Sequence, residues 1–206
     1  SFDADAQEIN SYSGGSLARL AAGARRLAYR IDTYGSLSSS TRIALLDPGT
    51  GRFTIGPTLG NADPADRSIE VGDYDGDGLD EAFVSAATPP GTPPFGSVAV
   101  AYDLQDGLRT FTTPVSDRPY GAIGRGDLDN DGRDEFATIT GLGLVQAWDV
   151  AGQSQLFSAG TAVLGLGRRT RIVDLDGDGV REIVAATSER VTVFGRTAVS
   201  GTFAER

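Results

Sequence analysis

Short apolar runs, separated by turns rich in glycine and aspartate, recur along this chain. Such runs of four to eight residues, bounded by turn residues, are typical of β-strands. In the second half of the chain they follow a fixed order: a short run, an acidic segment, a second run, a third run that ends near an aromatic residue, and a final segment with a phenylalanine. The second runs are 82–84, 136–139 and 183–186, the third are 98–103, 144–149 and 190–195, and the phenylalanines are Phe111, Phe157 and Phe203.

Four short strands in a unit of this length are typical of one blade of a β-propeller. We therefore predict an all-β fold of about four blades, each a four-stranded antiparallel sheet. An earlier copy is weaker, because its acidic segment is replaced by Ala21–Arg25. The predicted segments are an N-terminal extension or remnant strand over 1–13, a blade without a metal loop over 14–62, and three blades with acidic loops over 66–115, 119–161 and 167–206.

The acidic segments align without gaps and start 54 and then 47 residues apart, at Asp73, Asp127 and Asp174. Each has aspartate at positions one, three and five, glycine at position six and glutamate at position nine. We place these loops between the first and second strands of their blades. Carboxylates so close together repel one another unless a cation lies among them.

Calcium fits such a loop, because it binds six to eight oxygen atoms and a glycine permits the sharp turn. The predicted ligands are the carboxylates at positions one, three, five and nine and the backbone carbonyl at position seven. The three predicted calcium sites are Asp73, Asp75, Asp77, Leu79 and Glu81; Asp127, Asp129, Asp131, Arg133 and Glu135; and Asp174, Asp176, Asp178, Val180 and Glu182.

Two simpler interpretations are weaker. Asp-Gly clusters often form turns without any metal, but three complete copies with a closing glutamate favour ligation. An EF-hand closes at position twelve and is flanked by helices, whereas here glutamate stands at position nine and apolar strands follow. Magnesium is less suitable, since it prefers rigid octahedral sites that keep several waters.

Composition narrows the possible functions. The 206 residues include no Lys, His, Cys or Met, so Ser-His-Asp and Cys-His nucleophile systems, histidine-bound zinc and Schiff-base chemistry are excluded. The formal charge of −10 disfavours nucleic acid as a partner.

Half of the 28 acidic residues lie in the three nine-residue loops, and three bound Ca²⁺ ions would bring the net charge of the protein to about −4. No apolar run approaches the ~18 residues of a membrane helix, so we expect no membrane insertion.

The three Asp-x-Asp-x-Asp-Gly-x-x-Glu segments, each followed by an apolar strand, resemble FG-GAP/VCBS repeats, the blades of integrin α-subunit heads and of many bacterial surface proteins. The resemblance covers about residues 66–206 well and 14–62 loosely, and it is nearest to the bacterial type, because Phe95-Gly96 and Phe194-Gly195 are the only traces of the Phe-Gly signature. It implies a calcium-bearing propeller that is secreted or on the cell surface, with a signal peptide absent from this chain and expected to have been removed.

The expected function is a non-catalytic, calcium-stabilised, lectin-like binding or adhesion module that engages a protein or carbohydrate ligand through the face opposite the calcium loops. Candidate contact segments are Arg118, Arg168–Arg169 and the proline-rich loop 89–94. One alternative is a structural subunit of a surface assembly or filament. Another is the propeller of a polysaccharide-active, lyase-like enzyme, which the absence of His, Lys and Cys disfavours.

Four blades are fewer than the seven that are common in this family. An end blade in an open stack exposes an apolar face. We considered a closed ring of four blades, self-association of chains to complete a propeller or an assembly, and a fragment of a longer protein, and we favour the last two.

Overall fold

A computed structural model describes residues 9–34, 39–61, 69–88, 96–141, 143–161, 169–196 and 203–205. Within this part of the chain the strands form four antiparallel sheets of four strands, each built from strands consecutive in sequence. The predicted all-β class with four blade-like sheets is confirmed. In sheets 2, 3 and 4 the acidic segment connects the first strand to the second, as expected.

The four sheets use successive stretches of the chain. Sheet 1 contains β1 (Ile9–Arg19), β2 (Arg25–Tyr34), β3 (Ser39–Asp47) and β4 (Arg52–Gly60), with a short 3-10 turn, η1 (Ala21–Gly23), between β1 and β2. Sheet 2 contains β5 (Ile69–Gly72), β6 (Glu81–Ala87), β7 (Ser97–Asp103) and β8 (Arg109–Thr112). Sheet 3 contains β9 (Tyr120–Gly126), β10 (Glu135–Thr140), β11 (Leu144–Asp149) and β12 (Ser154–Gly160), and sheet 4 contains β13 (Arg169–Val173), β14 (Glu182–Ala186), β15 (Val191–Arg196) and β16 (Phe203–Glu205).

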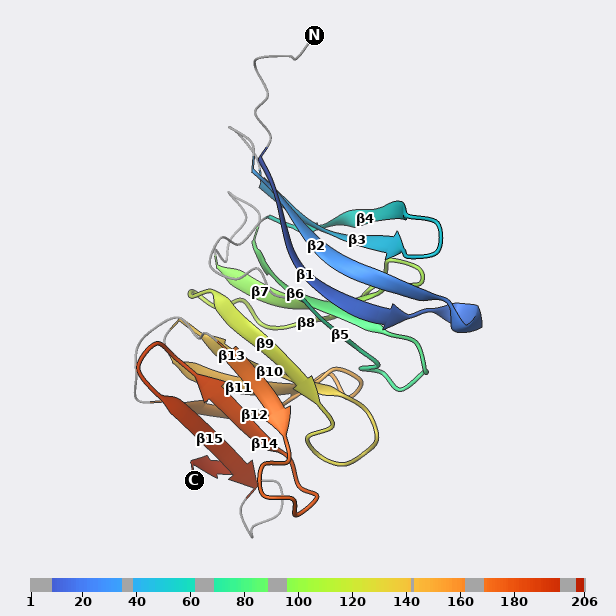
Figure 1. The fold of residues 1–206 in the computed structure, drawn as a ribbon. Helices are drawn as coiled ribbons and strands as arrows, with labels where there is room; N and C mark the ends of the chain where they lie inside the picture. The colour runs from blue at the N-terminus through green and yellow to red at the C-terminus, as the bar shows by residue number, and fades with distance from the viewer. Residues whose placement is uncertain are drawn as a thin grey trace.

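The sheets stack in a row in sequence order, from sheet 1 (blue) to sheet 4 (red) (Figure 1). Their first strands, β1, β5, β9 and β13, contact one another in turn along the inner side of the row. An ion pair joins Arg171 of β13 to Glu70 of β5, with 3.2 Å between Nη1 and Oε1, although sheets 2 and 4 are not neighbours. The row is therefore curved toward its first strands, and sheets 1 and 4 form its two ends.

Three apolar clusters fill the three spaces between neighbouring sheets. The cluster between sheets 1 and 2 includes Ile43 and Val100, and the one between sheets 2 and 3 includes Phe83 and Phe136, whose ring centroids lie 3.7 Å apart. The third cluster joins sheets 3 and 4 around Ile139, Phe157 and Phe194. Because alternate residues of a strand point to opposite faces, the middle sheets contribute to a cluster on each side.

This double burial explains the sequence of the second strands. In β6 the first six residues, Glu81 to Ala86, are all buried, and in β10 all six residues are buried. Such strands read as continuous apolar runs rather than as an alternation, because both of their faces are covered.

Gly124 permits the close approach of the inner strands of sheets 3 and 4. A Cβ atom at this position would lie 2.3 Å from the carbonyl oxygen of Thr170 in β13. Any larger residue would push the two sheets apart at this point.

A buried ion pair lies between sheets 1 and 2. Arg30 and Asp32, neighbours on one face of β2, are both fully buried, and the Arg30 Nε donates to both carboxylate oxygens of Asp32 at 3.0 and 2.9 Å. Arg30 Nη1 also donates to Ser85 Oγ of sheet 2 at 3.2 Å, and Thr41 Oγ1 donates to Asp32 at 2.6 Å. The pair thus fixes how sheet 1 lies on sheet 2.

We expect Asp32→Ala to lower the free energy of unfolding by about 3–5 kcal/mol, because it removes the carboxylate that neutralises a buried guanidinium. Urea denaturation followed by circular dichroism measures the change. The double variant Arg30→Met/Asp32→Leu is the control, since an apolar pair of similar volume restores most of the loss. A loss below about 1 kcal/mol for Asp32→Ala, the usual value for an exposed pair, would contradict the prediction.

Candidate metal centres

Three equivalent loops carry the acidic residues, and they lie on the same side of the row of sheets (Figure 1). Each loop spans eight residues between a first and a second strand that are paired at the loop's base, as Gly72 is with Glu81. The backbone of each loop has positive φ at positions four and six. These residues are glycine except for one asparagine: Gly76, Gly78, Asn130, Gly132, Gly177 and Gly179. Left-handed turns of this kind favour Gly and Asn.

Each loop brings three of its predicted ligands together. Oxygen atoms from positions one, three and nine lie within 4.8 Å of one another in the groups Asp73, Asp75 and Glu81; Asp127, Asp129 and Glu135; and Asp174, Asp176 and Glu182. The structure therefore contains three acidic clusters that can each hold a metal ion.

The closing glutamate is the buried member of every cluster. Glu81, Glu135 and Glu182 are each only 1 % exposed. Their Oε2 atoms accept a hydrogen bond from the backbone N–H at position two of the same loop, at 2.7 Å from Tyr74, 2.5 Å from Leu128 and 3.0 Å from Leu175. Position nine thus holds the start of the loop in place with one carboxylate oxygen.

Electrostatics within the clusters favour a cation. Burial raises the pKa of Glu81 and that of Glu135 to about 8, and the aspartates at positions three and five of each loop add to the increase. Burial also raises the pKa of Asp75. In addition, Asp127 Oδ1 is buried and has no hydrogen-bond partner among the described residues. A hard cation would neutralise the charges and occupy this oxygen, so the residues present fit a metal ion.

The predicted ligands at positions five and seven are not part of the three clusters. At position five, the carboxylates of Asp77, Asp131 and Asp178 accept the N–H of position seven at 2.8, 2.9 and 2.8 Å, and they are not members of the clusters. Asp131 also pairs with the guanidinium of Arg133. The backbone carbonyls of Leu79, Arg133 and Val180 remain predicted ligands.

Sheet 1 has an arginine where the other sheets begin their loop with aspartate. Ala18 pairs with Arg26 as Gly72 pairs with Glu81, so Arg19 has the place of Asp73 and Arg26 that of the closing glutamate. The guanidinium of Arg19 donates to Asp80 Oδ1 in sheet 2, with Nη2 at 3.0 Å, and its backbone N–H donates to Asp80 Oδ2 at 2.6 Å. A positive side chain thus stands at the position of the first carboxylate.

A contact that the sequence did not reveal links each loop to the preceding sheet. The residue at position eight reaches back to the carbonyl at position one of the sheet before it. Asp80 N donates to Arg19 O at 3.0 Å, Asp134 N donates to Asp73 O at 3.2 Å, and Arg181 Nη1 donates to Asp127 O at 2.5 Å. The sequence shows which residue stands at position eight of each loop, but no pattern in it indicates which residue this position contacts.

A cavity of about 340 Å³ lies between sheet 3 and the connection from β8 to β9. Trp148, Gln146 and Thr140 are among its lining residues, and their Nε1, Oε1 and Oγ1 atoms are buried without a hydrogen-bond partner among the described residues. Thr140 pairs with Tyr120 at the end of the β9–β10 hairpin farthest from the acidic loop. One end of the cavity therefore lies far from the acidic loop, whereas Trp148, which pairs with Phe136 next to Glu135, lies nearer to it.

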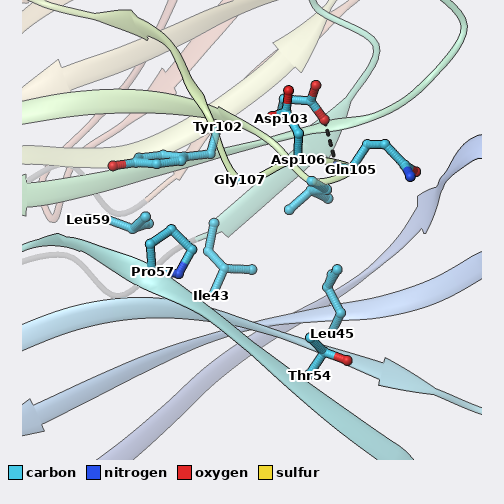
Figure 2. A pocket seen from close by; sticks show the side chains of 12 residues that line it. Ile43, Leu45, Thr54, Pro57, Leu59, Tyr102, Asp103, Gln105, Asp106 and Gly107 are labelled. Atoms are coloured by element: carbon cyan, nitrogen blue, oxygen red, sulfur yellow. Dashed lines mark hydrogen bonds between the residues drawn. The ribbon is translucent and has the colours of Figure 1, made fainter.

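A second cavity, of about 190 Å³, separates sheet 1 from the β7–β8 turn of sheet 2 (Figure 2). Its wall is apolar, with Ile43, Leu59 and Tyr102 among the lining residues. The acidic residues at its edge are engaged in the turn, since Asp103 Oδ1 accepts the N–H of Gln105 at 2.6 Å and Asp106 Oδ1 that of Leu108 at 2.7 Å. It therefore offers few free polar groups to a ligand.

The predicted contact segments are only partly described. Arg118 is exposed in the β8–β9 connection, and Arg169 is exposed at the start of β13. Loop 89–94 and Arg168 lie outside the described residues.

We expect the protein to bind three divalent cations, and Asp129→Ala to bind two, because the variant lacks one carboxylate of a single cluster. Isothermal titration calorimetry with CaCl₂ measures the stoichiometry. Asp117→Ala, which removes an exposed carboxylate outside the loops, is the matched control and keeps three sites. An unchanged stoichiometry for Asp129→Ala would contradict the assignment of this cluster.

Comparison of the sequence with protein-family models gave no match, and a search of curated proteins found no significant similarity. None of the helical segments in the described residues is long and apolar enough to cross a membrane. The resemblance to FG-GAP/VCBS repeats therefore depends on the loop residues and their spacing alone. In the structure, three of these residues in each loop lie close together.

Proposed function

We propose that this protein is a calcium-stabilised, non-catalytic binding module that acts outside the cell or at the cell surface. The observation that carries the proposal is the presence of three equivalent clusters of carboxylates on one side of the stacked sheets. The resemblance to FG-GAP/VCBS repeats supports the same function.

Calcium suits these clusters better than other common cations. The donors are all oxygen atoms, three carboxylates at each site, on loops whose glycines permit a tight backbone. Flexible all-oxygen sites of this kind favour calcium over magnesium, and the chain has no His or Cys that would favour zinc.

The ion would act by tying each loop to the sheets. Position two of the loop places Tyr74 and Leu128, both fully buried, in the interfaces between sheets 2 and 3 and between sheets 3 and 4. Position eight contacts the preceding sheet. A cation that joins positions one, three and nine therefore stabilises the loop and, through it, two packing interfaces.

We expect the melting temperature to be higher in CaCl₂ than in EDTA, because calcium binds the folded loops and not the unfolded chain. At 100 times the dissociation constant each site contributes about 2.7 kcal/mol. Extracellular modules bind calcium at about 10⁻⁴–10⁻³ M, so millimolar CaCl₂ is a suitable condition. MgCl₂ at equal concentration is the control, and an identical melting temperature in CaCl₂ and EDTA would refute calcium-stabilised folding.

The ligand surface is best placed at the cavity of Gln146 and Trp148, and the ligand class that fits is an uncharged saccharide. The residues that line the cavity carry an N–H donor, an amide oxygen and a hydroxyl that are buried and that the described part of the chain does not satisfy. Sugar hydroxyls both donate and accept hydrogen bonds, so one ring can satisfy all three groups. No charged side chain is buried in this cavity; its one acidic residue, Asp117, is exposed.

We expect the protein to bind a neutral sugar on a glycan array, and Gln146→Leu to weaken that binding about tenfold, because a hydrogen bond of about 1–1.5 kcal/mol is lost. Titration calorimetry with the strongest array hit measures the affinity. The matched control is Gln105→Leu, which changes a glutamine at the other cavity (Figure 2). Loss of binding in Gln105→Leu but not in Gln146→Leu would move the site to that cavity, and no array hit would refute saccharide binding.

A further inference from the structure

Large apolar side chains are exposed at the two ends of the row of sheets. Among the described residues, seven large hydrophobic side chains are exposed, and six of them belong to sheet 1 or to sheet 4 and its loop. In sheet 1 they are Leu17, Phe53 and Ile55, which are 48, 58 and 58 % exposed, and in sheet 4 they are Val173, Leu175 and Val191, which are 38, 55 and 63 % exposed. The seventh, Leu108, is in the β7–β8 turn.

The exposed residues of sheet 1 form one continuous surface on the side away from sheet 2. Ala18 and Ala28 face sheet 2, so Leu17 and Leu27, their neighbours in sequence, face the opposite side. Strand pairing aligns Leu17 with Leu27, Leu27 with Leu46, and Leu46 with Phe53 across all four strands. We call this surface the sheet 1 end face.

Sheet 4 has a corresponding surface on the side away from sheet 3. Ile172, Ile183 and Phe194 face sheet 3, so Val173, Val184 and Val193 face outward. Val191 is on the same side of β15 as Val193. We call this surface the sheet 4 end face.

Each end face resembles one side of the interface that neighbouring sheets form inside the molecule. In the interfaces between sheets 2 and 3 and between sheets 3 and 4, one sheet and the residue at position two of its loop meet the next sheet along the chain. Tyr74 and Leu128 at this position are fully buried, whereas Leu175, at the same position in sheet 4, is 55 % exposed. The sheet 4 end face is therefore of the kind that receives a following sheet, and the sheet 1 end face is of the kind that covers a preceding one.

The charges at the two ends are complementary in the same way. Arg181, at position eight in sheet 4, contacts both the carbonyl and the carboxylate of Asp127 in sheet 3, at 2.5 and 3.3 Å. Arg25 has the equivalent place in sheet 1, is exposed, and makes no ion pair within the described part of the chain. Asp174 has the place of Asp127 in sheet 4. A sheet 1 end face stacked on a sheet 4 end face would bring Arg25 to Asp174.

We propose that a second copy of this chain covers both end faces, with sheet 1 of each copy stacked on sheet 4 of the other. A second copy supplies both halves of the repeated interface and both partners of the Arg25–Asp174 pair. Stacking like on like would instead place two Arg25 side chains, or two Asp174 carboxylates, at one interface. A pair that closes in this way buries two such interfaces and leaves no end face exposed. Of the residues used here only Asp174 belongs to an acidic cluster; the apolar residues of the two end faces belong to none, so the stacking itself requires neither a bound cation nor a saccharide.

Sedimentation equilibrium in CaCl₂ at micromolar concentration tests the proposal. The expected mass is twice that of the 21.4 kDa chain. Phe53→Glu and Val191→Glu each place a charge on one end face and should sediment as single chains. Mixed in equal amounts, these two variants should form a pair again, because one end face of each is intact and the two intact faces are complementary. Leu108→Glu is the matched control, since Leu108 is equally exposed but lies on neither end face, and it should remain paired.

Three outcomes would overturn the proposal. A single-chain mass for the unmodified protein would show that another partner, or more sheets of a longer chain, covers the end faces. Pairing of Val191→Glu alone would indicate contact between two sheet 1 end faces. Failure of the mixed variants to pair, with both folded by circular dichroism, would exclude complementary stacking. Because calcium stabilisation is measured by melting, its result is independent of the mass.

Discussion

The stacking of one sheet on the next is the interaction on which the rest of this structure depends. A four-stranded sheet with apolar side chains on both faces buries all of them only when a layer lies on each side. In the row of four sheets this condition is met completely for sheets 2 and 3, whose second strands are buried almost throughout. Sheets 1 and 4 each meet it on one side, and most of the exposed large hydrophobic side chains of the described chain are found on their other sides.

The acidic loops contribute both to the electrostatics of the molecule and to the packing of its sheets. Each collects carboxylates at one edge of a sheet and buries its closing glutamate, which is why the pKa values of Glu81 and Glu135 are raised without a cation. The same loops place position two in the next interface and position eight against the preceding sheet. The acidic cluster and the contacts with the neighbouring sheets therefore belong to the same nine residues, so a cation bound in the loop would support the order of the sheets.

Sheet 1 has the same fold as the other sheets, but arginine stands at two of the positions that carry carboxylates in their loops. Arg19 stands where the other sheets have their first aspartate, and it binds Asp80 of the neighbouring loop. The interface between sheets 1 and 2 also contains the buried pair of Arg30 and Asp32. Ion pairs within the protein thus lie between sheets 1 and 2 at the end of the row where no acidic cluster is found among the described residues. The chain's positive charges are all arginine, which suits such multidentate contacts.

The sequence by itself determined the all-β class, the four-stranded units and the acidic loops, because strand periodicity and ligand spacing are local properties that repeat three times. It did not determine which loop carboxylates meet: those at positions one, three and nine come together, whereas Asp77, Asp131 and Asp178 at position five lie outside the clusters. Nor did it reveal the Arg30–Asp32 pair, the position-eight contacts or the Trp148 cavity. These depend on how one sheet lies on the next, and only the tertiary structure fixes distances between residues that are far apart in the chain.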